Sequence, residues 1–168
     1  YMITFSGFET TFSLFTNTFF DFSLKQNSLV FMYAGLIGLV VQGYISRRSF
    51  TQFKRLSIFG MGLLAAAFVG LAVSQTVFQL MLFLGLLSVA VSFVNTFLPS
   101  LLSMHTTDDN KGIVMGSYEA VGSISRVLGP LLAYSVSFQL LRQEYLLFAI
   151  TCLVSAVFLL FFLKSVKQ

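Results

Sequence analysis

The chain has 168 residues, of which 57% are hydrophobic and 10% are charged, with a formal net charge of +4. This scarcity of charge and a mean hydropathy of +0.89 exclude an ordinary soluble domain, in which about 25% of residues are charged. The basic residues flank hydrophobic runs, which is typical of membrane topology signals and not of a nucleic-acid surface. We therefore expect a polytopic membrane protein with no nucleic-acid partner.

Six hydrophobic runs separated by short polar segments predict an all-α fold of six transmembrane helices. The predicted spans are about 1–20, 29–45, 56–74, 77–103, 112–138 and 145–163. The third and sixth spans contain no charge, which fits two three-helix units arranged as inverted repeats. Because Tyr1 already lies in an apolar run and is not methionine, we expect the chain to begin inside a longer protein.

The first span has an aromatic face and a polar face. Phenylalanines recur every three or four residues, while serines, threonines and Glu9 fall on another face. An acid near the middle of a span is costly in lipid, so we expect Glu9 to face protein or water. Proton coupling or substrate contact is one interpretation of Glu9, and a hydrogen bond to the hydroxyl stripe is the other. The aromatic face is interpreted as packing, with contact to an aromatic substrate as the alternative.

The loop at 46–55 carries the strongest basic cluster of the chain, formed by Arg47, Arg48, Lys54 and Arg55. If this loop is cytoplasmic, seven of the ten Lys and Arg residues lie on the cytoplasmic side and two on the other. The positive-inside rule then places the C-terminus in the cytoplasm as well.

The fourth span, about 77–103, has two unusual residues in its second half. Asn95 is predicted to be a buried amide, which needs a hydrogen-bond partner. Its role is either functional or structural, with no preference from the sequence. Pro99 lacks a backbone donor and is expected to kink the helix.

The fifth span carries two charges on one helical face. Glu119, Gly122, Arg126 and Gly129 recur at three or four residues, so their side chains point the same way. Arg126 leans toward Glu119, about 10 Å away along the axis, and we expect the two to pair directly or through water. Either Arg126 has a functional role, or it forms a structural ion pair that fixes helix packing. Glu119 is open to the same two interpretations.

Small residues on a second face of this span predict close helix packing. Gly112, Gly116 and Ala120 form a small-xxx-small stripe, and Gly122 and Gly129 thin the charged face. Pro130 weakens the helix just after Arg126 because it removes a backbone donor. We predict that these glycines and Pro130 serve gating and helix packing.

Several function classes lack their motifs. The chain has one cysteine, Cys152, and one histidine, His105, with no metal-ligand spacing, no P-loop and no cofactor motif. We therefore expect no enzyme activity, no metal and no cofactor. A non-transporting membrane scaffold, a half-transporter that only binds partners and a channel subunit are the alternatives to a transporter.

The order of these features resembles the C-terminal half of a major facilitator superfamily transporter, most closely the drug:proton antiporter branch with its tetracycline-transporter-like members. The resemblance covers nearly the whole chain. The residues that carry it are Ser6-Gly7-Phe8-Glu9, Gly35-Leu36, Gln42-Gly43, Arg47-Arg48, Lys111-Gly112-x-Val114-Met115-Gly116 and Arg126-x-x-Gly129-Pro130. The loop from Gly43 to Arg55 departs from the family's G-x-x-x-D-R-x-G-R motif, because Ser46 stands where an acid is common and the late glycine is missing.

The resemblance implies that the six spans are helices seven to twelve of a twelve-helix protein whose N-terminal half is absent from this chain. It implies secondary active transport of small organic solutes by alternating access, with protons as the coupling ion, as efflux or antiport of drug-like molecules or organic anions. In that family the first and fourth of these spans line the central cavity, while the second and fifth contact the other half. We expect a multi-pass protein of the plasma membrane or of an endosomal or lysosomal membrane.

Overall fold

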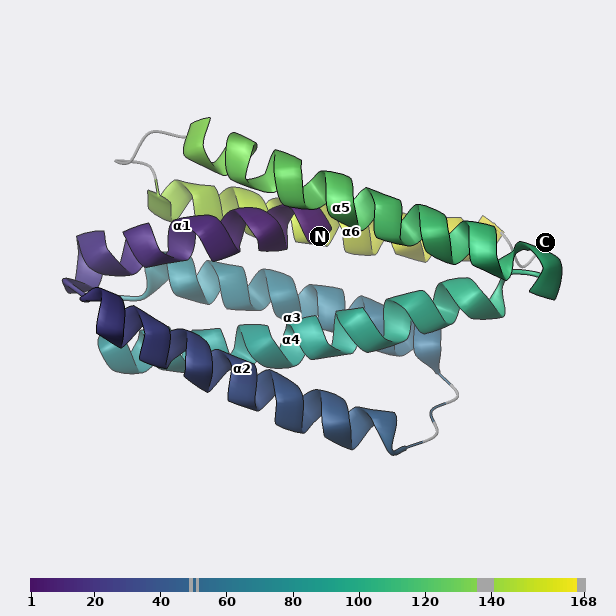
Figure 1. The fold of residues 1–168 in the computed structure, drawn as a ribbon, viewed down its shortest axis with the longest axis horizontal. Helices are drawn as coiled ribbons and strands as arrows, with labels where there is room; N and C mark the ends of the chain where they lie inside the picture. Colours follow the sequence, from purple (N-terminus) through teal and green to yellow (C-terminus); the bar gives the residue numbers. More distant parts are fainter. Residues whose placement is uncertain (49, 51, 136–140, 166–168) are drawn as a thin grey trace.

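The structure, a computed structural model, describes residues 1–48, 50, 52–135 and 141–165, with side chains up to Phe161. In this part of the chain, six long helices run side by side as a bundle (Figure 1). They are α1 (Met2–Phe20), α2 (Leu24–Ser46), α3 (Phe53–Val73), α4 (Val77–Met104), α5 (Lys111–Ser135) and α6 (Leu141–Ser165), with a 3-10 turn, η1 (Asp108–Asn110), before α5. Residues 136–138 of the predicted fifth span, and Lys167, lie outside the described residues.

Each predicted span coincides with one helix, but α2 and α6 begin well before their predicted starts, and α3 begins at Phe53 instead of residue 56. α2 begins at Leu24 instead of residue 29, because Ser23 and Gln26 form a capping box that satisfies free backbone donors. α6 begins at Leu141 instead of residue 145. Arg142 and Glu144 were predicted to lie in a loop, and they belong to the first turn of α6 instead. This turn is anchored by Arg142, whose Nη2 donates a hydrogen bond to the carbonyl of Ser74 at 2.9 Å.

The short connections are set by local side chains. α1 ends at Asp21, whose φ of 54° lies in the left-handed region that the short polar Asp side chain tolerates. Thr76 and Gln79 form a second capping box at the start of α4. The two connections lie at the same end of the bundle (Figure 1).

Close approach of glycine to neighbouring side chains determines which helices pair. α3 packs on both α4 and α6, while α1 packs on α5 and α2 on α4. A Cβ on Gly70 of α3 would overlap the ring of Phe83 on α4, so only glycine fits there. A Cβ on Gly129 of α5 would lie 2.7 Å from the carbonyl oxygen of Ile3 and 2.9 Å from the backbone nitrogen of Gly7 on α1. The α1–α5 pair therefore depends on Gly129.

The core lies where α1, α3, α4 and α6 meet, and it is rich in aromatic rings between α1, α3 and α6. Phe12 and Phe15 of α1, Phe68 of α3 and Tyr145 of α6 are fully buried. The Phe15 and Tyr145 ring centroids lie 4.7 Å apart in a tilted arrangement, a favourable geometry for aromatic pairs. The interpretation of this phenylalanine face as packing is therefore confirmed for Phe12 and Phe15.

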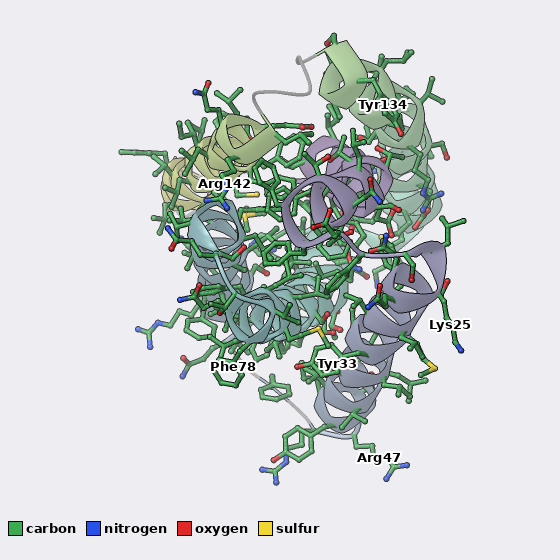
Figure 2. The ribbon with its side chains drawn as sticks, turned by 90° about the vertical axis from the view of Figure 1, so that its left-hand side faces the viewer. Lys25, Tyr33, Arg47, Phe78, Tyr134 and Arg142 are labelled. Carbon is green, nitrogen blue, oxygen red and sulfur yellow. The ribbon has the colours of Figure 1, made fainter. Side chains whose placement is uncertain are left out.

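Four of the described helices are long and apolar enough to cross a membrane: α2, α3, α4 and the segment Leu141–Phe161 of α6. α1 and α5 do not reach this apolarity, because they carry the polar stripes with Glu9, Glu119 and Arg126. Both nevertheless run alongside the apolar helices in the bundle (Figure 1). Seen from the end of the bundle, Lys25 points outward from α2, and Arg142 lies over the end of α3 (Figure 2).

Candidate functional site

The four polar residues predicted as substrate or proton-coupling residues line one cavity. Glu9 of α1, Asn95 of α4, and Glu119 and Arg126 of α5 surround a space of about 410 Å³, which we call the polar cavity. Its other lining residues are Tyr1, Met2, Phe5, Ser6, Pro99, Tyr118 and Gly122. Residues separated by more than 100 positions in the sequence thus meet because α1 packs on α5 beside the second half of α4.

Tyrosine hydroxyls connect the three helices across this cavity. Tyr1 donates a hydrogen bond from its hydroxyl to Oδ1 of Asn95 at 3.0 Å. The hydroxyls of Tyr1 and Tyr118 lie 2.9 Å apart, within hydrogen-bonding distance. The prediction that Asn95 is buried is wrong within this chain, because its side chain is exposed to the cavity. The predicted hydrogen-bond partner of the Asn95 amide is present, and it is the Tyr1 hydroxyl. The amide lines the cavity instead of being buried.

The expected pairing of Arg126 with Glu119 does not form directly. Within the described residues the ion pair found is between Lys111 Nζ and Asp108 Oδ1, at 2.6 Å. The main-chain carbonyl of Arg126 accepts a hydrogen bond from the Ser6 hydroxyl at 3.4 Å, which helps to hold α5 against α1. The guanidinium is exposed to the polar cavity. Because an arginine keeps its charge at every working pH, it provides a permanent positive group there.

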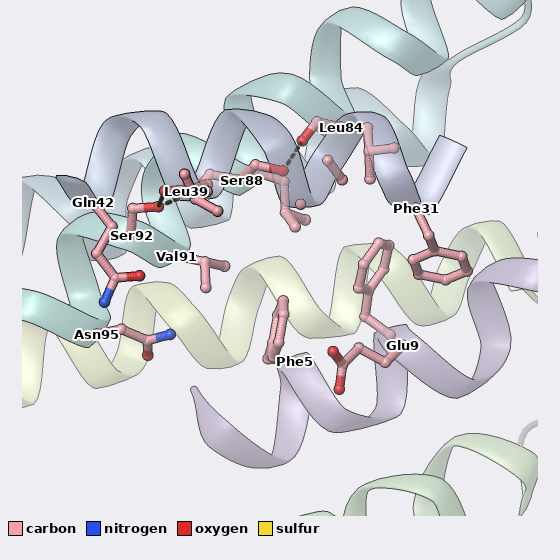
Figure 3. Close-up of a pocket in the computed structure, with 15 residues that line it drawn as sticks. Phe5, Glu9, Phe31, Leu39, Gln42, Leu84, Ser88, Val91, Ser92 and Asn95 are labelled. Atoms are coloured by element: carbon pink, nitrogen blue, oxygen red, sulfur yellow. Dashed lines mark hydrogen bonds between the residues drawn. The ribbon is translucent and has the colours of Figure 1, made fainter. Parts of the chain in front are cut away.

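A second cavity of about 480 Å³ lies between α1, α2 and α4 (Figure 3). We call it the apolar cavity, because aromatic and aliphatic side chains provide most of its wall; its polar lining residues are Glu9, Gln42, Ser88, Ser92 and Asn95. Ser92 donates its hydroxyl proton to the carbonyls of Ser88 at 2.9 Å and Gly38 at 3.2 Å, so it also ties α4 to α2. Its apolar and aromatic lining residues include Phe5, Phe8, Phe31, Leu39, Leu84, Leu87 and Val91.

Three residues line both cavities: Phe5, Glu9 and Asn95. Figure 3 shows Glu9 and Phe5 extending from α1 toward the space in front of α4. Together they form the wall between a charged region and a hydrophobic region. Such a pair of adjoining spaces can hold a small molecule that has a polar end and an apolar body.

The predicted packing residues of α5 divide into two groups. Gly129 is in tight contact with α1, and a Cβ on Gly122 would lie 3.4 Å from Sδ of Met2. A Cβ on Gly112 or Gly116 would meet nothing within 4 Å in the described structure, so no helix of this chain packs on that stripe. Pro130 is accommodated inside α5, which continues to Ser135.

The basic cluster lies away from both cavities. Arg47, Arg48, Lys54 and Arg55 are at the opposite end of α2 from Lys25, and Figure 2 shows Arg47 pointing outward there. The Arg48 guanidinium lies 4.8 Å from the centre of the Tyr44 ring, a cation–π contact. Lys54 and Arg55 fall in the first turn of α3.

Sequence reasoning missed Tyr1, Tyr118 and Gln42 as cavity residues. A usable signal was present: Tyr1, Phe5 and Glu9 recur every four residues, and so do Tyr118, Gly122 and Arg126. Among the described residues, no group of three or more His, Cys, Asp or Glu side chains is placed to hold a metal ion.

Comparison with known proteins gives a consistent family match. Residues 51–168 match the Major Facilitator Superfamily. The chain is 32% identical over 137 residues to mouse major facilitator superfamily domain-containing protein 10, and 33% identical over 141 residues to the human protein. It is 26% identical over 127 residues to rat solute carrier family 22 member 18.

The fold also matches a solved structure. The crystal structure of the human organic anion transporter MFSD10 (TETRAN) superposes with a TM-score of 0.86 at 30% sequence identity, over 95% of this chain and 38% of that one. The matches to the mouse and human relatives cover 81% of this chain. They cover 30% of the length of each relative. These relatives point to a transporter and not to an enzyme. Because the family match covers more than half of the chain and the fold agrees with it, this chain belongs to the Major Facilitator Superfamily.

Proposed function

We propose that this chain is the C-terminal six-helix half of a proton-coupled secondary transporter that moves small organic anions by alternating access. The observation that supports this most is the polar cavity, where Glu9, Asn95, Glu119 and Arg126 converge from three helices. Charged groups inside a membrane domain are costly unless they bind a substrate, an ion or one another.

The half-transporter assignment is supported by length and by unfilled surfaces. The chain covers 38% of the related transporter structure, and that proportion suits about half of a longer protein. The stripe with Gly112 and Gly116 is open, although small residues at this spacing favour close helix contact. In our proposal the missing N-terminal half packs on α2 and α5 and completes both cavities. α1 and α5 are then true membrane spans, and the six helices form two inverted three-helix repeats.

The substrate class follows from the two cavities. Arg126 has no ion-pair partner among the described residues, so the polar cavity has a cation available for an anionic group. The adjoining apolar cavity provides aromatic and aliphatic surface for the rest of such a molecule. The related human structure is named an organic anion transporter, which supports the same class for this chain.

Glu9 is the proposed proton-coupling group because it lines both cavities and lies across from Arg126. When Glu9 is ionised, it competes with the substrate anion for the Arg126 guanidinium. When it is protonated, the guanidinium is free to bind the anion. Proton binding and anion binding are therefore linked through one cation, which is the minimum that coupling requires.

The test is transport by the full-length protein in proteoliposomes, using a fluorescent organic anion. A pH gradient should drive accumulation in the wild type, while Glu9→Gln should lose gradient-driven accumulation and keep anion exchange. Asp21→Asn, at the end of α1 outside both cavities, is the matched control and should behave as wild type. The proposal fails if Glu9→Gln still concentrates the anion with a normal response to the pH gradient.

A further inference from the structure

Glu144 is the only one of the six acidic residues of the chain that is buried. It lies in the first turn of α6, and its exposed fraction is 1%. Two polar neighbours share its environment: Tyr145, at 0% exposure, and Thr11 of α1, at 1%. The rest of the surroundings is the aromatic core of α1, α3 and α6. This cluster is separate from both cavities, whose lining residues do not include it.

The polar atoms of this cluster lack the partners that an ionised carboxylate needs. In the described part of the chain, neither carboxyl oxygen of Glu144 has a hydrogen-bond partner, and the Tyr145 hydroxyl has none either. The Thr11 hydroxyl interacts with both groups, but its proton is donated to the carbonyl of Gly7 at 3.1 Å. The lone pairs of the Thr11 hydroxyl oxygen remain available. While its proton is donated to Gly7, Thr11 can accept a hydrogen bond from a protonated carboxyl.

The cations of the packed helices do not neutralise Glu144. α6 packs on α3 and α1. On α6 itself, Arg142 donates to the Ser74 carbonyl at 2.9 Å, and its guanidinium carbon lies 4.7 Å from the centre of the Phe19 ring. The titratable groups of α3, Lys54 and Arg55, are in its first turn, whereas α6 begins beside its last residue. On α1 the titratable side chains are Glu9, which faces the cavities, and Asp21, which caps the C-terminal end of the helix; both are acids.

The burial of Glu144 limits access by groups outside this chain while α6 stays in place. A side chain that is 1% exposed is already covered by α1, α3 and its own helix. An unpaired carboxylate in such a site is strongly unfavourable, whereas the neutral acid has one proton to donate. The oxygens of Thr11 and Tyr145 are available acceptors for that proton.

We propose that Glu144 is a second proton-binding site of this protein, which holds its proton while the first turn of α6 is packed against α1. Release transfers the carboxyl proton to water and requires that this turn first separate from α1, so that water reaches the carboxylate. Proton binding therefore stabilises the packed position, and a rise in pH favours the open one. This site does not depend on Glu9 or on the substrate proposed for the cavities.

Amide hydrogen exchange in the full-length protein, measured by mass spectrometry at a series of pH values, tests this directly. After correction for the intrinsic pH dependence of exchange, protection of the α6 amides from Leu141 to Ala149 should fall with rising pH. The expected decrease is about tenfold per pH unit over the range in which the open state loses one proton, as a one-proton linkage requires. The amides of α2 provide the internal control and should show no such change.

Glu144→Gln keeps the size of the neutral acid and cannot ionise, so its α6 protection should be independent of pH. Glu144→Leu, which has no polar side chain, should also make the α6 protection independent of pH. If one of the two variants does not fold, the other still tests the proposal. Glu9→Gln should retain the wild-type pH dependence of α6, and it separates this site from the coupling site proposed in the cavities. Wild-type protection that is independent of pH, or an unchanged pH dependence in the Glu144 variants, would overturn the proposal.

Discussion

Glu9 of α1 and Arg126 of α5 line the same cavity, yet no ion pair joins them within the described residues. Their charges still attract each other across the cavity. An acid and a permanent cation held near each other, but not locked together, leave space for an anion to bind between them. In the proposed function, this relationship connects proton binding at Glu9 with substrate binding at Arg126.

The α1–α5 contact that creates the polar cavity depends on Gly129. A Cβ at this position would lie 2.7 Å from the Ile3 carbonyl oxygen and 2.8 Å from the Ser6 Cβ, neither of which can move as a flexible side chain would. We expect Gly129→Ala to destabilise the full-length protein by about 1–3 kcal/mol, the usual cost of overpacking. A thermal unfolding scan of the purified protein would measure it.

Gly62 of α3 is the matched control for this substitution, because a Cβ there meets nothing within 4 Å. Gly62→Ala should leave the melting temperature unchanged or raise it, since alanine favours helix by up to about 1 kcal/mol over glycine. Equal melting temperatures for the two alanine variants would show that the close approach at Gly129 is not limiting.

The Tyr1 hydroxyl connects Asn95 and Tyr118 across the polar cavity, at 3.0 Å and 2.9 Å. Tyr1→Phe removes this hydroxyl and keeps the ring, so two hydrogen bonds are lost at about 0.5–1.5 kcal/mol each. We expect the transport KM for the organic anion to rise by roughly fivefold to thirtyfold, which corresponds to a loss of about 1–2 kcal/mol. Concentration-dependent uptake measures this change.

Tyr33→Phe is the control for a lost phenol, because the Tyr33 hydroxyl donates to the Met81 carbonyl at 3.4 Å and lines neither cavity. It should leave the KM close to the wild-type value. If Tyr1→Phe is also unchanged, the hydroxyl network does not contribute to substrate binding.

The charge distribution predicts that the basic cluster at Arg47, Arg48, Lys54 and Arg55 is cytoplasmic. Gln52 and Lys25 are exposed residues at opposite ends of the bundle, so a single cysteine can be placed at either position. In a cysteine-free background of the full-length protein, an impermeant thiol reagent added to intact cells should label Lys25→Cys and not Gln52→Cys. The labelling test applies to the protein molecules that reside in the plasma membrane. The opposite labelling pattern would invert the topology.

Much of this arrangement could be predicted from the sequence, because membrane helices are marked by long apolar runs and functional positions by charges within them. Glu9, Glu119 and Arg126 stand out as charges in otherwise apolar surroundings, and the structure places all three on one cavity. Spacing within one helix also identifies a shared face. These signals lie within short stretches of sequence, so they can be recognised without knowing how the helices pack.

Features that depend on contacts between distant helices could not be predicted. Asn95 faces a cavity and bonds to Tyr1, although its apolar neighbours in sequence suggest burial. Glu144 looks like a loop residue, yet the Arg142 contact with Ser74 extends α6 and buries the carboxyl. Gly116 and Gly129 have similar sequence surroundings, but only Gly129 meets another helix of this chain. The difference lies in which side of α5 faces α1.

Arg126 provides the most direct test of the central claim that the polar cavity binds and couples substrate. Lysine keeps the charge but lacks the planar group that binds a carboxylate through two parallel hydrogen bonds. Surface expression and organic-anion uptake should be measured side by side for Arg126→Lys and Arg126→Ala in the full-length protein. We predict near-normal surface expression of Arg126→Lys with uptake reduced at least about tenfold, as expected when about 1.4 kcal/mol of binding is lost. Near-normal uptake by Arg126→Lys, together with loss of Arg126→Ala from the membrane, would contradict the account and leave Arg126 a structural residue.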